Sequence, residues 1–416
     1  MYLKVNSNFI IKFNLDGSKA IAYNLINYNE YYFVDTEAKI LYELINNFKN
    51  IDDVEVQFDR EKVGLTINKV IGLKICKTYS NNIISEPLKP INELLLKLPK
   101  FRKFSLDRLV FEITGECNLS CSFCLTGNIV YRSCGCKKWE SNNILLINDY
   151  ISIIDQAKRF NLKQIDFLGG EPLIRWELLK EIIEYLDDTG ITIRLFTNGS
   201  LIDYEKVMFF KKHNVNLIIQ ILGFENHYNK LGIESNEYKK IKDAVKLVSD
   251  NSLNSIIYIL VNSINEQDIN KIKLEYEKNG FNYEEVYLYP SNEYFSKLYL
   301  DKMLSPEIRS LKLNLFNYQL MEYVNCCLNS QIYISCDGNI YPCMMLRKII
   351  GNINNNELWE IFHKGEYKKF WEVKKHDLDT CKDCELSFKC FDCRALEYNK
   401  TLNLHGMYYC NRVTDC

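Results

Sequence analysis

The sequence predicts an α/β protein with a parallel sheet at its centre, a small α+β module before it and an irregular region after it. Three observations predict this. Apolar β-rich runs alternate with segments of helical period through the middle of the chain. The first hundred residues instead show shorter strand-like runs, and the last hundred are rich in cysteine. The expected parts are residues 1–95, 104–310 and 311–416, a division that suits a chain of 416 residues.

Composition narrows the class of protein. The chain is 47% apolar and 25% charged, as in ordinary soluble globular proteins, and its net charge is −2. That balance gives no general attraction to nucleic acid or to an anionic membrane. The N-terminus, Met1 to Ile11, lacks the apolar core of a signal peptide, and runs such as Ile256–Val261 are too short to cross a bilayer. We therefore expect a cytoplasmic protein without nucleic-acid or membrane partners.

The first hundred residues are expected to form a small module. The pair Asp16-Gly17 separates two apolar runs and is typical of a hairpin turn. Asp35 or Thr36 is expected to cap the helix that follows. In order, the expected elements are strands at Phe9–Asn14, Ala20–Asn24 and Tyr31–Val34, a helix after residue 35, the apolar stretch Val54–Phe58 and a helix at Glu61–Ile71. The proline-bearing stretch Ile83–Lys103 is expected to be a linker with one short helix.

The middle of the chain alternates strand and helix six times. Strands are expected at Leu109–Ile113, Gln164–Leu168, Ile191–Phe196, Asn216–Ile221, Ile256–Val261 and Glu284–Leu288. Helices are expected between them at Ile144–Phe160, Trp176–Asp188, Tyr204–His213, Glu237–Asp250 and Gln267–Asn279. Such alternation predicts a parallel sheet. Six units make about three-quarters of a (β/α)8 barrel, but an open doubly wound sheet gives a similar period.

Cysteine is the unusual feature of the composition. There are 16 cysteines and no export signal, so metal ligands or catalytic thiols are expected rather than disulfides. One group runs from Cys117 to Cys136 and another from Cys326 to Cys416, while Cys76 stands alone. This clustering predicts two separate metal-bearing regions.

The first group begins directly after the first strand of the alternating region. Cys117, Cys121 and Cys124 fall within eight residues, so their thiolates can bind three corners of a 4Fe–4S cube and leave the fourth iron open. Zinc is the competing interpretation, with Cys134 or Cys136 as a fourth ligand. The position matters because active sites of parallel α/β folds lie at the carboxyl ends of the strands.

The spacing of these cysteines, the aromatic Phe123 before the last of them, and their place after a first strand resemble the radical SAM superfamily. The resemblance implies a partial (β/α)6 TIM-like barrel. It also implies that S-adenosylmethionine binds the open iron and is cleaved there to a 5′-deoxyadenosyl radical. The protein's part is then to orient the cofactor and exclude water.

Three further matches lie where that family needs them. Gly169-Gly170-Glu171-Pro172 follows the second strand, and the resemblance assigns this loop to the methionyl amino group. A glycine pair allows the backbone to approach a ligand closely. Thr197-Asn198-Gly199 closes the third strand and Asn262 the fifth, and the resemblance makes both cofactor contacts. Taken alone, each of these would be an ordinary loop.

The C-terminal cysteines resemble the SPASM extension of radical SAM enzymes, which carries two auxiliary 4Fe–4S clusters. The resemblance assigns one cluster to Cys381, Cys384, Cys390 and Cys410, and the other to Cys327, Cys343 and Cys393. The last short spacing is two residues instead of the family's usual three, and zinc ribbons also use paired cysteines.

A fourth ligand of the second cluster could be Cys326 or Cys336, or the site could stay open and bind a substrate thiolate. Cys134, Cys136 and Cys416 remain unassigned.

The order of three strands and a helix in the first hundred residues resembles the leader-peptide recognition element of ribosomal peptide maturases. That winged-helix-like element binds its peptide by adding it as a strand to an exposed sheet edge. The alternative is a dimerisation or capping module.

Three functions remain open on the sequence. The first is a peptide maturase that forms a cross-link, such as a cysteine thioether, in a leader-bearing precursor, with electrons from a flavodoxin or ferredoxin. The second is an anaerobic sulfatase maturase, although Met344 and Leu222-Gly223 stand where that group usually has Asp and Asp-Gly. The third is a non-enzymatic iron–sulfur scaffold, which would have no need of the loop Gly169–Pro172.

Overall fold

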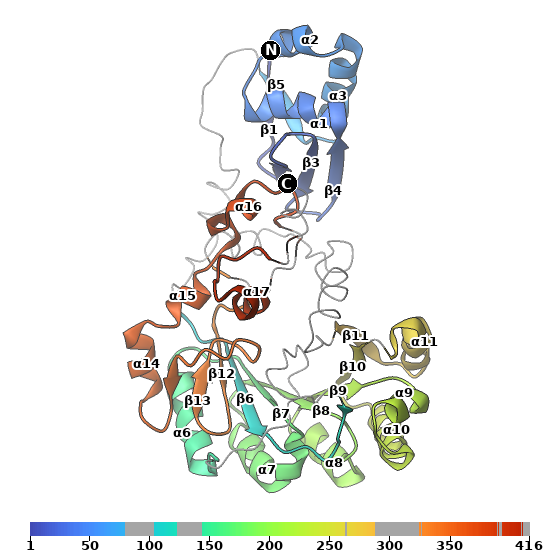
Figure 1. Cartoon of the computed structure of the whole chain (residues 1–416), viewed down its shortest axis with the longest axis vertical. Coiled ribbons are helices and arrows are strands. Elements are labelled where there is room, and N and C mark those ends of the chain that lie inside the picture. The colour runs from blue at the N-terminus through green and yellow to red at the C-terminus, as the bar shows by residue number, and fades with distance from the viewer. Residues whose placement is uncertain are drawn as a thin grey trace.

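The computed structural model describes residues 1–79, 104–122, 144–262, 264–287, 324–325, 327–388, 390, 393–408 and 410. Several residues of interest lie outside these ranges: the expected linker Ile83–Lys103, Phe123, Cys124, Cys134, Cys136, Cys326 and Cys416. The N-terminal module lies at one end of the long axis and the main sheet near the other, with C-terminal helices α16 (Asp379–Lys382) and α17 (Arg394–Thr401) between them (Figure 1).

The N-terminal module contains two antiparallel sheets and three helices. The expected hairpin is confirmed, and Gly17 at its turn has φ +67°. The elements are β1 (Tyr2–Val5), β2 (Phe9–Phe13), β3 (Lys19–Asn24), β4 (Glu30–Val34), α1 (Asp35–Leu41), a π-helical turn (Tyr42–Asn46), α2 (Ile51–Gln57), α3 (Arg60–Gly72) and β5 (Cys76–Tyr79). Strands β2, β3 and β4 form one sheet in that order, and β1 pairs with β5.

Helix starts in this module differ from the expectation in one place. Helix α1 begins at Asp35 itself, after Val34, and no side chain caps it. The expected cap by Asp35 or Thr36 is therefore wrong. The two helices after it are capped by side chains, because Asn50 accepts from Asp53 N and Asp59 accepts from Lys62 N.

The main sheet has nine strands among the described residues, and six of them form the predicted alternating region. These are β6 (Arg108–Thr114), β7 (Gln164–Gly169), β8 (Thr192–Thr197), β9 (Asn216–Ile221), β10 (Ser255–Val261) and β11 (Asn282–Tyr287). The helices are α6 (Ile147–Lys158), α7 (Trp176–Tyr185), α8 (Tyr204–Lys212), α9 (Glu225–Lys230), α10 (Ser235–Asp250) and α11 (Ile269–Lys278), with 3₁₀ turns η2 (Pro172–Arg175) and η3 (Glu266–Asp268).

The order of the strands distinguishes a partial barrel from an open doubly wound sheet, the two folds that the alternation of strands and helices allowed. The six strands are parallel and follow one another as spatial neighbours from β6 to β11, without a reversal. Right-handed crossovers that always move in one direction place every helix on the same face of the sheet. A doubly wound sheet would reverse its order instead. The sheet is therefore that of a partial TIM-like barrel, as expected.

The C-terminal region is more regular than the sequence indicated. Its first strand, β12 (Gln331–Ile334), pairs in parallel with β6, and β13 (Asn339–Tyr341) and β14 (Gly351–Asn352) continue the sheet. The other elements are α14 (Leu358–Lys364), α15 (Lys368–Trp371), η4 (Lys375–Asp377), α16 (Asp379–Lys382) and α17 (Arg394–Thr401). Residues such as Ile332 and Trp371 belong to the same apolar core as the barrel. Within the described residues, no helix is both long and apolar enough to cross a membrane.

The inner face of the sheet carries a buried ion network around Asp166. Asp166 on β7 has a side-chain exposure of 0% and accepts from both Arg108 on β6 and Arg194 on β8. Burial alone would raise the pKa of Asp166, but the bonds and charges of Arg194 and Arg108 outweigh it and lower that pKa. Three neighbouring strands are thereby tied together on their concave side.

Replacing Asp166 by Ala is expected to lower the free energy of unfolding by about 3–5 kcal/mol, because Arg108 and Arg194 lose their shared partner. Urea denaturation measures the change. The matched control is Asp107→Ala, which breaks an exposed pair with Lys163 at 2.9 Å and is expected to cost at most about 1 kcal/mol. Equal losses in the two variants would contradict the buried-network assignment.

Candidate active site

Two loops meet at the carboxyl end of the sheet, one after β6 and one after β7. The backbone N–H of Gly170 donates to the carbonyl of Thr114 at 2.7 Å, and that of Glu171 donates to the carbonyl of Glu116 at 2.7 Å. The Cys117–Cys121 segment follows immediately. The second loop therefore fixes the backbone from which the first two cysteines project.

Glycine is required at both positions of this contact. A Cβ on Gly170 would lie 1.9 Å from the Glu116 carbonyl oxygen, and one on Gly169 would lie 2.3 Å from that of Thr114. Gly169 also has φ +143°, which side-chain-bearing residues rarely adopt. The sequence predicted close backbone approach here, and the neighbour that the backbone approaches is the cysteine loop.

The buried carboxylate of Glu171 joins the loop after β7 to the loop after β8. Its carboxylate, fully buried, accepts from Thr197 Oγ1 at 2.8 Å, Asn198 N at 2.8 Å and Leu173 N at 3.1 Å. Burial raises the pKa of Glu171 to about 7, while the bonds from Asn198, Leu173 and Thr197 act in the opposite direction. Pro172 begins the 3₁₀ turn η2 beside it. The side chain of Glu171 thus ties the loop after β8 to the loop after β7.

The loop after β8 in turn reaches the first cysteine. Asn198 Nδ2 lies 3.9 Å from Cys117 Sγ and donates to Asn118 Oδ1 at 3.0 Å. Asn118 donates to Ser200 Oγ at 2.7 Å, and Gly199 N donates to Thr197 Oγ1 at 3.0 Å. Asn118 and Ser200 were not predicted, although each adjoins a predicted residue.

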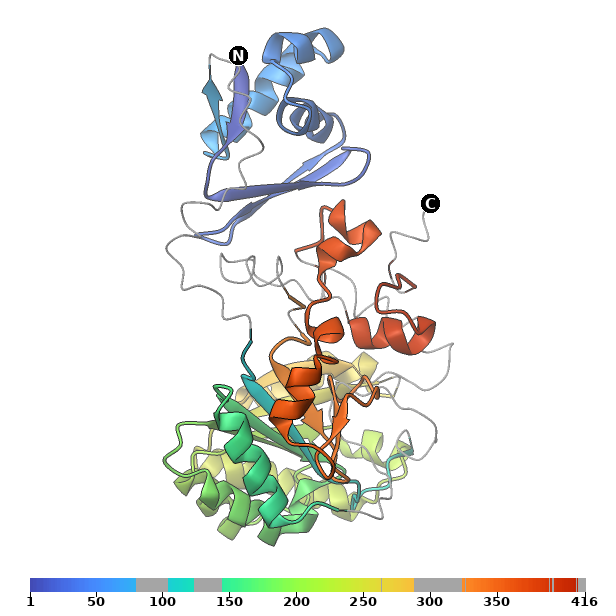
Figure 2. The same cartoon turned by 90° about the vertical axis from the view of Figure 1, so that its left-hand side faces the viewer.

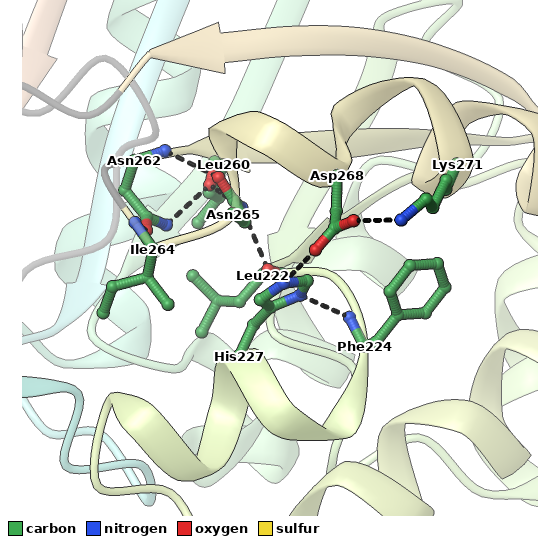
Figure 3. Close-up of polar contacts among 9 residues, drawn as sticks. All are labelled: Leu222, Phe224, His227, Leu260, Asn262, Ile264, Asn265, Asp268 and Lys271. Atoms are coloured by element: carbon green, nitrogen blue, oxygen red, sulfur yellow. Dashed lines mark hydrogen bonds and ion pairs between the residues drawn. The ribbon is translucent and has the colours of Figure 1, made fainter.

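The loops after β9 and β10 are joined by Asn265, which the sequence analysis missed (Figure 3). Its fully buried side chain donates to the carbonyls of Leu222 and Leu260, both at 2.9 Å, and accepts from Asn262 N at 2.8 Å. Asn262 itself donates to Leu260 at 3.0 Å. The predicted residue Asn262 therefore lies at the expected strand end, and Asn265 sets its backbone.

A buried histidine supports the loop after β9 from below (Figure 3). His227 Nδ1 accepts from Phe224 N at 3.0 Å, so the ring proton is assigned to Nε2, which faces Asp268 Oδ2 at 3.3 Å. Asp268 also pairs with Lys271 at 2.8 Å. A Cβ on Gly223 would lie 2.5 Å from His227 Nδ1, which explains the glycine at this position.

Helix α9 links that loop to the second cysteine. The hydroxyl of Tyr228 accepts from Leu222 N at 3.1 Å, and the carbonyl of Leu231 accepts from Ser122 N at 3.0 Å. Burial raises the pKa of Tyr228, and Cys121 is among the charged groups near it. Cys121, 8% exposed, is thereby held on the same side of the sheet as Cys117.

The C-terminal cysteines fall in more than one place. Burial is the main cause that raises the pKa of Cys343 to about 12, and a Cys327 thiolate adds to the rise. Cys327 itself is exposed. Burial also raises the pKa of Cys336 to about 12, but its neighbours are Glu112, Asp337 and the backbone of Gly115. Cys336 thus borders the first cysteine loop.

An ion pair joins the turn after Cys343 to β6, the first strand of the parallel region. Arg347 Nη2 donates to Glu112 Oε2 at 3.1 Å and to Tyr333 Oη at 3.2 Å. Its guanidinium lies 4.8 Å and 5.0 Å from the ring centroids of Tyr333 and Tyr341. Glu112 is fully buried, so its charge needs this partner. The same turn carries Met344, which packs against the apolar inner face of the sheet.

Cysteines 381, 384 and 390 follow one another through consecutive turns. Cys384 N donates to the carbonyl of Cys381 at 3.3 Å, and Cys390 N donates to that of Leu386 at 2.8 Å. Cys393 precedes helix α17, and Cys410 lies beyond it. Within the ranges described, no three His, Cys, Asp or Glu side chains are gathered as a metal site. Thiolates are the ligands that iron–sulfur clusters use, so the donor chemistry of these residues fits such a group.

Two protein families match consecutive parts of the chain. Residues 111–274 match the radical SAM superfamily, and residues 326–385 match the SPASM iron–sulfur cluster-binding domain. These are the two families that the cysteine patterns resembled.

Two curated relatives are named as a maturating enzyme and a maturation protein. A cysteine-type anaerobic sulfatase-maturating enzyme of Clostridium novyi (strain NT) is 23% identical over 325 residues, covering 67% of this chain and 85% of that protein. The sporulation killing factor maturation protein SkfB of Bacillus subtilis (strain 168) is 24% identical over 293 residues, covering 65% of this chain and 69% of that protein.

Solved structures share the fold at low identity. SuiB of Streptococcus suis, bound to S-adenosylmethionine, has a TM-score of 0.54 at 18% identity and covers 98% of this chain and 100% of its own. The anSMEcpe structure with bound AdoMet has a TM-score of 0.55 at 20% identity, covering 74% of this chain and 91% of its own.

Gly170→Ala is expected to destabilise the protein by more than about 2 kcal/mol, because the new methyl group must push the Glu116 carbonyl away. The matched control is Gly64→Ala in helix α3, where nothing lies within 4 Å of the added Cβ. That change is expected to stabilise by about 0.5–1 kcal/mol. Thermal unfolding of both variants measures the difference, and a neutral Gly170→Ala would show that the loop contact is dispensable.

Proposed function

Since the chain is a radical SAM enzyme with a SPASM domain, we propose that it matures a ribosomally synthesised peptide by abstracting hydrogen and forming a cross-link, a cysteine thioether in the first instance. The main structural support for radical chemistry is the pair of hydrogen bonds that the backbone N–H groups of Gly170 and Glu171 donate to the loop that bears Cys117 and Cys121. The peptide substrate is supported by the N-terminal module and by the relatedness to SkfB.

When bound, a 4Fe–4S cluster on Cys117, Cys121 and Cys124, together with S-adenosylmethionine, supplies a 5′-deoxyadenosyl radical. The chain's own residues orient the cofactor. The backbone at Gly169 and Gly170 packs against the loop of Cys117 and fixes it, and Asn198 places its amide nitrogen 3.9 Å from Cys117 Sγ. We assign cofactor contacts to Phe123, Gly169, Gly170, Glu171, Pro172, Thr197, Asn198, Gly199 and Asn262. For Glu171 the role is indirect, because its carboxylate is already occupied by three donors.

Forming a thioether from a C–H and an S–H group is a two-electron oxidation of the peptide. One hydrogen atom leaves as part of 5′-deoxyadenosine, and the remaining proton and electron must also be removed. We propose that auxiliary clusters, when bound, would supply an acceptor for the electron. Their ligands would be Cys381, Cys384, Cys390 and Cys410 for one, and Cys327, Cys343 and Cys393 for the other. The antiparallel pairing of β12 with β13 supports the second set, because it returns Cys343, after β13, toward Cys327, before β12. Cys336 lies in the turn at the opposite end of this hairpin, which makes it a poor fourth ligand.

The N-terminal module is proposed to bind the precursor's leader along β4. Strand β4 is an outer strand of the three-stranded sheet and is followed directly by helix α1. An extended peptide can add to such an edge through backbone hydrogen bonds. The likeness to SuiB takes in nearly the whole chain, module included, and SuiB has been solved with S-adenosylmethionine.

A sulfatase-maturase activity is the second candidate, favoured by the relatedness to the Clostridium novyi enzyme. Such an enzyme would oxidise Cys or Ser to formylglycine. One observation weighs against it: Met344, at the position of that group's usual Asp, packs among apolar side chains of the inner sheet face. No carboxylate stands at that position to take a proton.

The proposal implies a particular setting. The chain would divide at 1–95, 104–310 and 311–416, and a flavodoxin or ferredoxin would supply the first electron. A reducing cytoplasm would keep the cysteines available as ligands.

Anaerobic, iron-reconstituted enzyme with dithionite is expected to convert S-adenosylmethionine to 5′-deoxyadenosine, measured by liquid chromatography. Replacing Cys117, Cys121 and Cys124 by Ala is expected to abolish the conversion, because the cluster loses its three protein ligands. Cys76→Ala is the matched control, since Cys76 is buried in the core of the N-terminal module. Cleavage that survives the triple replacement would overturn the radical SAM assignment of these residues.

Addition of the leader from a precursor encoded beside the enzyme's gene is expected to slow hydrogen exchange of the β4 amides, because an added strand bonds to them. Exchange measured by mass spectrometry should leave β2, the other outer strand, unchanged. Protection of β2 alone, or of neither strand, would reject binding at β4.

A further inference from the structure

The turn between Cys384 and Cys390 has buried residues although it holds little apolar material. Leu386 and Phe388 are its apolar residues, yet Glu385, Ser387 and Phe388 are only 2–3% exposed. Buried backbone carbonyls in such a turn need hydrogen-bond donors. The structure supplies them from two sides.

On one side, the N-terminal module bonds to the turn. Tyr23 on β3 is 1% exposed, its hydroxyl donates to the Glu385 carbonyl at 2.8 Å, and its ring meets that of Phe388 edge-on at 5.9 Å. Lys12 on β2 donates to the Lys382 carbonyl at 3.4 Å, and its ammonium lies 5.2 Å from the Phe388 ring centroid. The views in Figures 1 and 2 both place the module's sheet beside this part of the chain.

The sheet of the module is buried on one face by its own core and on the other face around Ile10 and Tyr23. Residues opposite one another share a face, and alternate residues along a strand point to opposite faces. Phe9, Ala22 and Phe33 pack into the module's own core. Ile10 and Tyr23, which are paired in the register, are also buried but do not belong to that core. Antiparallel sheets commonly leave their second face to water, so this face marks a contact between the parts of the chain.

On the other side, Lys375 bonds to the same turn. Its ammonium donates to the carbonyls of Ser387 and Cys390. The turn is therefore held between Lys375 from η4 and Tyr23 from the module, with Cys384 and Cys390 at its ends.

We infer that the N-terminal module braces an auxiliary-cluster loop, with Tyr23 as the positioning residue that keeps Cys384 and Cys390 in place. This inference rests on the proposed function for the auxiliary cluster itself. Tyr23 stands opposite Glu30 in the pairing of β3 with β4, so the strand proposed to receive the leader is the immediate neighbour of the brace. The peptide-binding element and the electron acceptor would thus share one interface.

The test uses the full chain with Cys117, Cys121 and Cys124 replaced by Ala, reconstituted with iron and sulfide, so that only auxiliary clusters contribute. Tyr23→Phe is made in this background. Iron release to a chelator is expected to be faster by about twofold to tenfold, the factor expected for one lost hydrogen bond. The electron paramagnetic resonance signal of the reduced cluster is expected to change as well.

Tyr31→Phe is the matched control, because its ring packs against Phe9 within the module at 6.1 Å. It is expected to leave the rate and the signal unchanged. Lys12→Met is expected to accelerate iron release to a smaller extent. If Tyr23→Phe lowers the melting temperature of the whole chain, the Lys12→Met result is used to test the inference instead. Unchanged release and spectrum in both Tyr23→Phe and Lys12→Met would overturn the inference. A background chain that binds no iron would instead overturn the auxiliary clusters, which separates the two failures.

Discussion

The contact between the Gly169-Gly170 backbone and the loop after β6 is the constraint on which the candidate site depends. Two neighbouring parallel strands deliver their loops to the same edge, where the carbonyls of Thr114 and Glu116 need donors. The second loop supplies them only because no Cβ intervenes. Once Glu171 is fixed in this way, its buried carboxylate accepts from Leu173 N in its own loop and from Thr197 and Asn198 in the loop after β8.

The remaining loops extend this arrangement around the sheet. Asn265 joins the ends of β9 and β10, and Tyr228 and Leu231 return from helix α9 to the loop after β9 and to Ser122. Each link uses a buried polar group whose loss would leave a partner unsatisfied. The cysteine loop is therefore positioned by a network of backbone contacts, and the rigidity that a cofactor site needs comes from the loops themselves.

Local patterns predicted the parts of this molecule that local forces determine. The alternation of strand-like and helix-like apolar segments predicted the six strands and the helices between them. The pair Asp16-Gly17 predicted the hairpin. Both patterns depend on residues that are close in the sequence. The loop Gly169–Pro172 was recognised, but the internal role of the Glu171 carboxylate was not, since its partners are 26 and 27 residues away. Strand β12 was missed for a related reason. Four residues carry little periodic signal, and its partner β6 precedes it by more than two hundred residues.

Two kinds of contact hold the C-terminal region. Ile332, Phe370 and Trp371 pack into the barrel's core. The turn around Cys384 is held by polar contacts instead, since Tyr23 and Lys375 donate to its backbone carbonyls. Capping and the proposed leader binding would use different parts of the N-terminal module. The face with Tyr23 contacts the turn, whereas the proposed binding site is the backbone edge of the outer strand β4, so one small sheet has room for both roles.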